Sequence, residues 1–150
     1  MSSERFMLNE TSYFGKGARE VLPEEIKARG FEKILVVTDK ALEDAGVTQK
    51  VLDFLDEAKI KYGVYNDVKP NPTIKNVQDG LSVAKLNNVD AIVAIGGGRV
   101  IDTAKAISII MTNPEHVNVV TLAGTPETKN KGLPLFALPT TAGTAAEVTI

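Results

Sequence analysis

Hydrophobic residues follow two alternating spacings along the chain after residue 30. Runs of consecutive apolar residues cover 34–37, 91–95 and 135–138. Such runs are typical of parallel strands that are buried on both faces. Apolar residues recur at helical spacing over 41–58, 74–86 and 100–110. This alternation predicts an α/β fold, in which flanking helices cover a doubly wound, mostly parallel sheet.

Turn-forming residues refine this pattern in the middle of the chain. Residues 62–65 predict a second short strand, and the two prolines within 67–72 predict a loop after it. Thr73 is placed to cap the helix that follows. Gly46 is expected to interrupt the segment 41–58, which would then form a pair of helices in place of one.

Two other segments have weaker patterns. Residues 7–14 could pair as a strand, and a first helix is expected from Gly17 to Arg29. Residues 112–133 mix Asn and Pro with one short apolar stretch at 117–123. They predict turns and exposed loop around a candidate short strand.

The composition is that of one globular domain over residues 1–150. The chain is 43% hydrophobic and 24% charged, with a net charge of −2 and no cysteine. Its lysines are scattered, so we expect neither nucleic-acid nor membrane partners, which need a concentrated basic face. No apolar run approaches the roughly 20 residues of a membrane helix, and the first ten residues lack the basic and apolar segments of a signal peptide. We therefore expect a cytoplasmic protein.

The sequence stops at three residues that are typical of a strand interior, Val148, Thr149 and Ile150. No turn signal or polar tail follows them, as would be common at a natural domain end. We therefore expect that the chain is truncated.

Gly96, Gly97 and Gly98 form the most informative motif, between an apolar strand and a helix. Glycines let the backbone turn sharply and approach a phosphate, and the helix N-terminus adds about half a positive charge. The alternative is a tight turn that merely needs glycine, but three in succession favour an anion site. Together with the α/β pattern, they are typical of a Rossmann-like fold. The common GxGxxG fingerprint is incomplete, because Ile101 stands at its third glycine.

Asp39 follows the first buried strand, where ligands bind in open α/β folds. Its carboxylate could accept a hydrogen bond from a ribose 2′-OH and repel a 2′-phosphate, which would favour NAD over NADP. A helix-capping role is an equal alternative, and the same two interpretations hold for Thr38.

Four segments in collinear order together resemble the iron-dependent alcohol dehydrogenases. They are VVTDKALEDAGV at 36–47, VKPNPT at 68–73, AIGGG with IDTAKAI at 94–107, and PTTAGTAAEVT at 139–149. Residues 7–18 and 108–134 are most similar to the lactaldehyde reductases, or propanediol oxidoreductases, within that family.

The resemblance implies a two-domain dehydrogenase whose N-terminal α/β domain binds the dinucleotide. By position, Asp39 would contact the adenosine ribose, and Gly97 and Gly98 the pyrophosphate. Other implied cofactor-binding residues are Asn71 and Pro72 beside the adenine, Thr140, Thr141 and Thr144 at the phosphate or nicotinamide, and Asp102 with Lys105 on the helix after the glycines. For Asp102 and Lys105, an ion pair on a solvated helix face is an equal alternative.

Arg99 departs from the family, which usually has serine at this position. A serine there would cap the helix, whereas arginine could supply a charge-assisted contact to phosphate or point into solvent. Arg99 therefore leaves the preference between NAD and NADP open.

The metal of the family is held by one aspartate and three histidines of a helical C-terminal domain, which this chain lacks. The single histidine, His116, cannot build a site for Fe(II) alone. We therefore expect no metal ligands here, Fe(II) in the complete enzyme, and better cofactor binding than turnover by this chain.

The leading hypothesis is the cofactor domain of an oligomeric oxidoreductase that interconverts a small, lactaldehyde-like aldehyde and an alcohol with NAD(H). The alternative is a stand-alone nucleotide-binding or self-assembling domain without dehydrogenase activity. Glycerol dehydrogenases and dehydroquinate synthases share the glycine turn, but TTAGTAAE at 140–147 argues against them.

Overall fold

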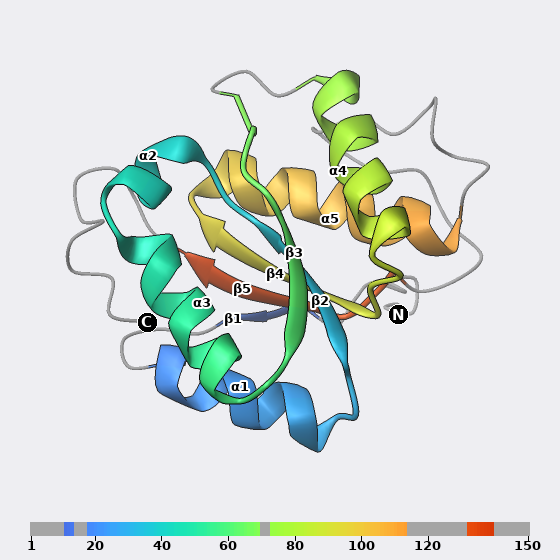
Figure 1. Ribbon diagram of the computed structural model, residues 1–150. Coiled ribbons are helices and arrows are strands. Elements are labelled where there is room, and N and C mark those ends of the chain that lie inside the picture. The colour runs from blue at the N-terminus through green and yellow to red at the C-terminus, as the bar shows by residue number, and fades with distance from the viewer. Residues whose placement is uncertain (1–10, 14–17, 70–72, 114–131, 140–150) are drawn as a thin grey trace.

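The computed structural model describes residues 11–13, 18–69, 73–113 and 132–139 (Figure 1). In chain order the elements are β1 (Thr11–Tyr13), α1 (Ala18–Ala28), β2 (Lys33–Val37), α2 (Lys40–Asp44), α3 (Val47–Glu57), β3 (Lys61–Tyr65), α4 (Ile74–Leu86), β4 (Ala91–Gly96), α5 (Gly98–Thr112) and β5 (Leu135–Pro139). The predicted helices and strands within these ranges are confirmed, with ends that differ by a few residues.

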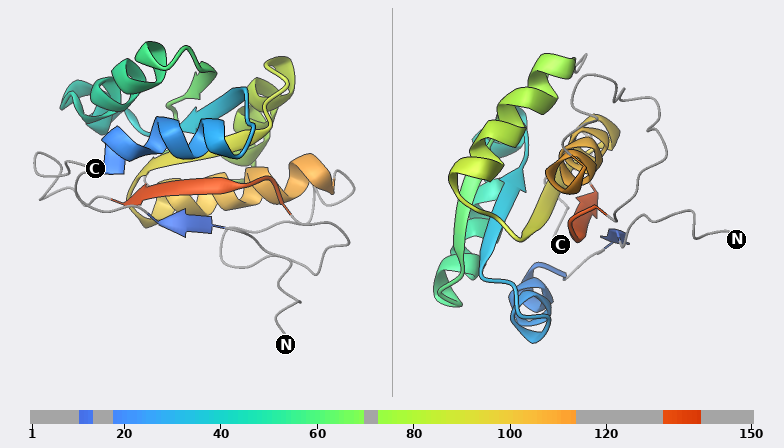
Figure 2. Two further views of the ribbon diagram at one scale, coloured as in Figure 1. Left: turned by 90° about the horizontal axis from the view of Figure 1, so that it is seen from below. Right: turned by 90° about the vertical axis from the view of Figure 1, so that its right-hand side faces the viewer.

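The strands of the described ranges form one parallel sheet in the order β1-β5-β4-β2-β3. From β2 the chain runs outward to β3 at one edge, and from β4 it runs the other way to β5. Figure 2 shows the short strand β1 beside β5 at the opposite edge. The predicted doubly wound α/β fold is confirmed.

Helices cover both faces of this sheet, because alternate residues of each strand point in opposite directions. Ile34 and Val36 pack with α1, α2 and α3, whereas Leu35 and Val37 pack with α4 and α5. Figure 1 shows α1 below the strands and α5 above them. The continuous apolar runs of the sequence are thus explained by strands that are buried on both faces.

Local turn chemistry sets the ends of two helices. Gly46 has a φ of 84°, a left-handed conformation that glycine adopts without strain, and it separates α2 from α3 as predicted. Thr73 caps α4, and its side chain accepts a hydrogen bond from the N–H of Asn76. The Asn76 side chain accepts in return from the N–H of Thr73, which completes a capping box.

The segment 112–133 is described only at its two ends. Helix α5 continues to Thr112, and Leu133 donates a backbone hydrogen bond to Ser108 of that helix. The candidate strand at 117–123 lies outside the described residues. None of the described helices has the length and apolar character needed to cross a membrane.

Candidate functional site

The carboxyl ends of β2 and β4 lie side by side at the point where the chain changes direction across the sheet. These strands are neighbours, and their outgoing connections lead to opposite edges and opposite faces. Ligands of open α/β sheets bind at such switch points. Asp39 follows β2, and the glycine triplet ends β4, so the topology brings the two leading sequence predictions together.

The glycine turn has the conformation and space expected of an anion site. Gly96 has a φ of 152°, and a Cβ atom there would lie 2.7 Å from Cγ2 of Val100. Gly97 is extended and is the N-cap of α5, with no side chain to cap the helix. Gly98 is exposed, and a Cβ atom there would meet no described side chain or distant backbone within 4 Å.

Among the described residues, no hydrogen-bond acceptor is seen for the first N–H groups of α5. The Gly97 carbonyl accepts hydrogen bonds from Val100 and Ile101, the first donors within the helix. The N–H groups of Gly98 and Arg99 precede these donors and have no acceptor within the helix. Because Gly97 contributes no capping side chain, an anion could take that place.

Asp39 has the capping role that was one of its two alternatives. It is the N-cap of α2, and its Oδ1 atom accepts a hydrogen bond from the N–H of Leu42 at 2.9 Å. Its Oδ2 atom lies 3.8 Å from Nη2 of Arg99. Capping uses one carboxylate oxygen, so the structure leaves room for a ligand-binding role at the other.

Thr38 serves the interior of the protein. Its side chain is fully buried, and its Oγ1 atom lies 2.9 Å from Oγ1 of Thr48 in α3. This hydrogen bond joins the end of β2 to α3. It accounts for a hydroxyl side chain at position 38, and no contact with a ligand is needed to explain it.

Arg99 is the second residue of α5, so the predicted effect of serine at this position was wrong. The N-cap is Gly97, because the extended backbone of the cap falls two residues earlier. A serine at position 99 would lie inside the first turn and could not be the cap. The Arg99 side chain is about half exposed, and its Nη2 atom lies 3.8 Å from Oδ2 of Asp39. A contact between Arg99 and phosphate stays a prediction.

Asp102 and Lys105 follow on α5. Asp102 is exposed and Lys105 is partly buried. Their proposed role in shaping the site stays a prediction.

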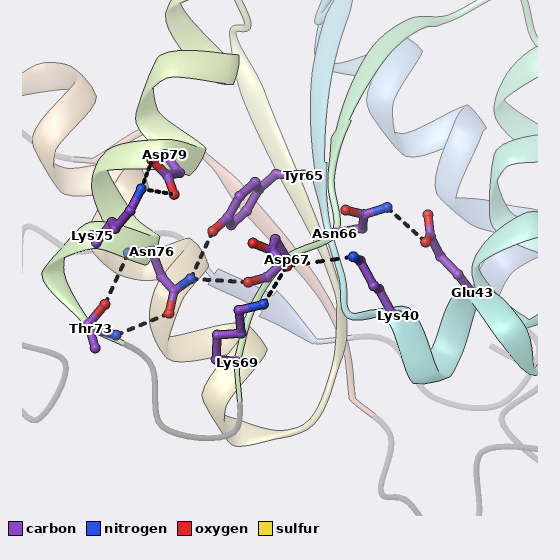
Figure 3. Close-up of polar contacts among 10 residues, drawn as sticks. All are labelled: Lys40, Glu43, Tyr65, Asn66, Asp67, Lys69, Thr73, Lys75, Asn76 and Asp79. Atoms are coloured by element: carbon purple, nitrogen blue, oxygen red, sulfur yellow. Dashed lines mark hydrogen bonds and ion pairs between the residues drawn. The ribbon is translucent and has the colours of Figure 1, made fainter.

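A network of hydrogen bonds joins the end of β3 to the start of α4 (Figure 3). The amide of Asn76 donates to the hydroxyl of Tyr65 and to the carbonyl of Asp67, both at 3.0 Å. Asn76 and Thr73 thereby fix α4 against β3. Asn76 was not among the predicted residues, although its place three residues after Thr73 is the spacing of a capping box.

Charged groups near this network shift the pKa values of Asp67 and Lys69. A hydrogen bond from Nζ of Lys69 lowers the pKa of Asp67, and the same contact raises the pKa of Lys69. Lys40 of α2 lies 3.9 Å from the same carboxylate. Burial raises the pKa of Tyr65, while the hydrogen bond from Asn76 opposes this effect. Figure 3 shows Asp67 between Lys40 and Lys69.

Five of the predicted cofactor residues lie outside the described residues. They are Asn71, Pro72, Thr140, Thr141 and Thr144. Described residues lie in the chain on either side of Asn71 and Pro72. Of these, Asp67 and Thr73 both form hydrogen bonds with Asn76 in the network at the end of β3. Pro139 ends β5 as the register partner of Gly96.

A separate cavity of about 400 Å³ opens at the other ends of β2 and β3. Its lining includes the four lysines Lys27, Lys33, Lys59 and Lys61. None of the predicted cofactor residues that the structure describes lines it, because Asp39 and the glycine turn follow the carboxyl ends of their strands.

The described residues contain no metal site. No three His, Cys, Asp or Glu side chains among them are grouped so that they could hold an ion. His116 lies outside the described ranges.

Known proteins resemble this chain over most of its length. The family model for iron-containing alcohol dehydrogenase matches residues 9–150. Lactaldehyde reductase of Escherichia coli (strain K12) is 49% identical over 148 residues, which is 99% of this chain and 39% of that protein. The chain thus spans about two fifths of the length of this relative.

Solved structures show the same fold. A 1,3-propanediol oxidoreductase matches with a TM-score of 0.78 and 38% identity, over 93% of this chain and 36% of that one. A sulfoacetaldehyde reductase from Bifidobacterium kashiwanohense, solved in complex with NAD+, matches with a TM-score of 0.69 and 31% identity. That match covers 92% of this chain and 36% of the neighbour.

Proposed function

The chain belongs to the iron-containing alcohol dehydrogenase family, and from this premise we propose that it is the dinucleotide-binding domain of an oxidoreductase. The complete enzyme interconverts a small, lactaldehyde-like aldehyde and an alcohol with NAD(H). The similarity to lactaldehyde reductase supports the substrate class, and the neighbour solved with NAD+ supports the cofactor.

One observation carries the proposal: the uncapped glycine turn of α5 and the Asp39 carboxylate face the same switch point. The N–H groups of Gly98 and Arg99, which have no acceptor within the helix, suit a pyrophosphate together with the positive end of α5. The Oδ2 atom of Asp39 is not used in capping and suits a ribose hydroxyl. These are the two anchors that a dinucleotide needs in this class of fold.

The other predicted contacts extend from these anchors. Asn71 and Pro72 would line the adenine side, next to the network of Asn76 and Tyr65. Thr140, Thr141 and Thr144 would follow the pyrophosphate toward the nicotinamide, from the strand end beside Gly96. Bound NAD(H) supplies the hydride that is exchanged with the substrate carbon. This chain's own residues hold and orient that cofactor.

Iron would need ligands other than the described residues, which form no cluster of three potential ligands. We therefore expect the 150-residue chain to bind cofactor more readily than it catalyses turnover. A dehydrogenase assay with and without added Fe(II) tests this expectation. Turnover that is stimulated by the metal would contradict it.

Calorimetric titration with NADH tests the binding site. We expect saturable binding to the chain and a large loss of affinity in Gly98→Val, whose side chain would enter the space that the pyrophosphate needs. Lys50→Ala on α3 is the matched control, because Lys50 is exposed and lies on an element that does not border the glycine turn. A folded chain that binds no NADH at millimolar concentration would overturn the proposal.

Self-association is a second candidate property. Strands β1 and β3 are the edges of the described sheet, and unpaired edges can pair with another copy of a chain. Size-exclusion chromatography over a range of concentrations tests this, and a monomer at all concentrations would exclude it. A chain that assembles but binds no nucleotide would favour the stand-alone domain over the dehydrogenase.

A further inference from the structure

An ion pair crosses the switch point on which the proposed cofactor site depends. The Nη2 atom of Arg99 lies 3.8 Å from the Oδ2 atom of Asp39. Arg99 belongs to the first turn of α5, whereas Asp39 caps α2. A cation on the phosphate-binding helix thus faces the carboxylate that is proposed to contact the adenosine ribose.

Asp39 alone would select against a 2′-phosphate. Its Oδ1 atom is held by the N–H of Leu42 at 2.9 Å, so Oδ2 is the oxygen left for a ribose hydroxyl. A phosphate monoester carries a charge of about −1.5 to −2 near neutral pH, and it would be repelled by an unpaired carboxylate at this place. Only 12% of the Asp39 side chain is exposed, so solvent would weaken this repulsion little.

Arg99 changes the electrostatics at the same oxygen. Its guanidinium is permanently charged and carries five N–H donors in one plane. Among the described residues, Asp39 is its only ion-pair partner within 4.0 Å, and the Arg99 side chain is 47% exposed. A long, half-exposed ion pair is weak, so the guanidinium can turn toward a stronger anion at little loss.

The geometry points to Arg99 as a specificity-determining residue that neutralises Asp39 and binds the 2′-phosphate of NADP(H). This inference rests on the proposed dinucleotide site. Its consequence is that the chain accepts both NADP(H) and NAD(H), with Asp39 serving the free ribose hydroxyl and Arg99 serving the phosphorylated one.

A role of Arg99 at the pyrophosphate makes a different prediction. The pyrophosphate is common to both cofactors, so a residue that contacts it would affect NADH and NADPH equally. The ratio of the NADH and NADPH affinities therefore distinguishes a contact with the 2′-phosphate from a contact with the pyrophosphate. A general effect of a variant on folding would change both affinities alike and would leave this ratio unchanged.

The experiment measures Kd for NADH and NADPH by calorimetry for the wild-type chain, Arg99→Ser and Arg99→Lys, in one buffer. We expect the wild-type values to lie within about tenfold of each other, because the Asp39 charge is compensated. In Arg99→Ser, NADPH binding should weaken by about tenfold or more while NADH binding changes much less, since charge-assisted hydrogen bonds are the stronger kind. Arg99→Lys should recover part of the NADPH affinity.

Lys50→Ser is the control for the change in net charge. It removes one positive charge from the exposed surface of α3 and should leave the affinity ratio unchanged. Asp39→Asn is the complementary variant, since it keeps a capping side chain and removes the negative charge. In Asp39→Asn, the affinity for NADPH should increase relative to the affinity for NADH.

The outcomes separate this inference from the proposed function. If neither cofactor binds to the folded wild-type chain, both fail. If both cofactors bind and Arg99→Ser weakens them equally, or leaves the ratio unchanged, the proposed function stands and the role of Arg99 in specificity is wrong.

Discussion

The side chain of Asn76 donates a hydrogen bond to the hydroxyl of Tyr65 at 3.0 Å, and so ties the first turn of α4 to the last residue of β3. The same amide donates to the carbonyl of Asp67, and its oxygen accepts from the N–H of Thr73. Asn76 is 5% exposed. One buried side chain therefore holds the described residues on both sides of the predicted adenine loop.

Asn76→Ala is expected to destabilise the chain by about 2–3 kcal/mol, because it leaves buried polar groups without partners. Urea unfolding followed by circular dichroism measures this loss. Tyr65→Phe removes only one of these hydrogen bonds and is the matched comparison, with a smaller expected loss of about 1 kcal/mol. Equal losses for the two variants would contradict the central role of Asn76.

Asp39 combines a capping role with a proposed ligand role, and two substitutions separate them. Asp39→Asn keeps an oxygen for the N–H of Leu42, so the free energy of unfolding should change by less than about 0.5 kcal/mol. Asp39→Ala removes the cap and should cost about 1 kcal/mol. Chemical denaturation measures both values. A similar loss in both variants would show that the charge, and not the cap, stabilises α2.

The glycines of the turn should differ in their tolerance of a side chain. Gly96→Ala places a Cβ atom 2.7 Å from Val100 at a φ of 152°, and it should destabilise the chain by at least about 2 kcal/mol. Gly98→Ala meets open space, so its effect on the free energy of unfolding should stay below about 1 kcal/mol. Thermal unfolding of the two variants tests the contrast, and a tolerated Gly96→Ala would contradict the described conformation.

The stability of the chain should fall in alkaline solution. Burial raises the pKa of Tyr65 above its ordinary value of 10.0, so the folded state favours the neutral phenol. This contribution is fully present below about pH 10. Above that pH the unfolded chain ionises first, and the contribution is lost as the pH rises through the pKa of the folded state.

Tyr65→Phe tests the origin of this pH dependence. Urea unfolding at several pH values from about 8 to 11 should give a shallower decline in the variant than in the wild type. Tyr62, whose pKa is also raised by burial, remains in both proteins and accounts for part of the residual slope. Identical slopes would show that Tyr65 does not contribute.

Local patterns were sufficient to predict most elements of the fold. The run at 91–95 is a buried strand because both of its faces are covered by helices. Thr73 caps α4, and Gly46 separates α2 from α3, because each interaction involves residues close in sequence. Such interactions leave a signal in the spacing of residue types.

Contacts between distant segments left no such signal. The Arg99–Asp39 pair exists because β2 and β4 are neighbours, and strand order is decided by packing of the whole sheet. The N-cap of α5 was misplaced for a related reason. Three successive glycines permit several backbone paths, and only the conformation of Gly97 decides where the helix begins.

The strand order also has a consequence for synthesis of the chain. Strand β1, at Thr11–Tyr13, pairs with β5, at Leu135–Pro139. A ribosome that adds about 5–20 residues per second needs on the order of ten seconds to make the intervening segment. During that interval the described partner of β1 has not been made, while β2, β3 and β4 can already pair. We therefore expect the N-terminal strand to dock late, and the nascent chain to expose the β4 edge to chaperones or to misassembly until β5 emerges.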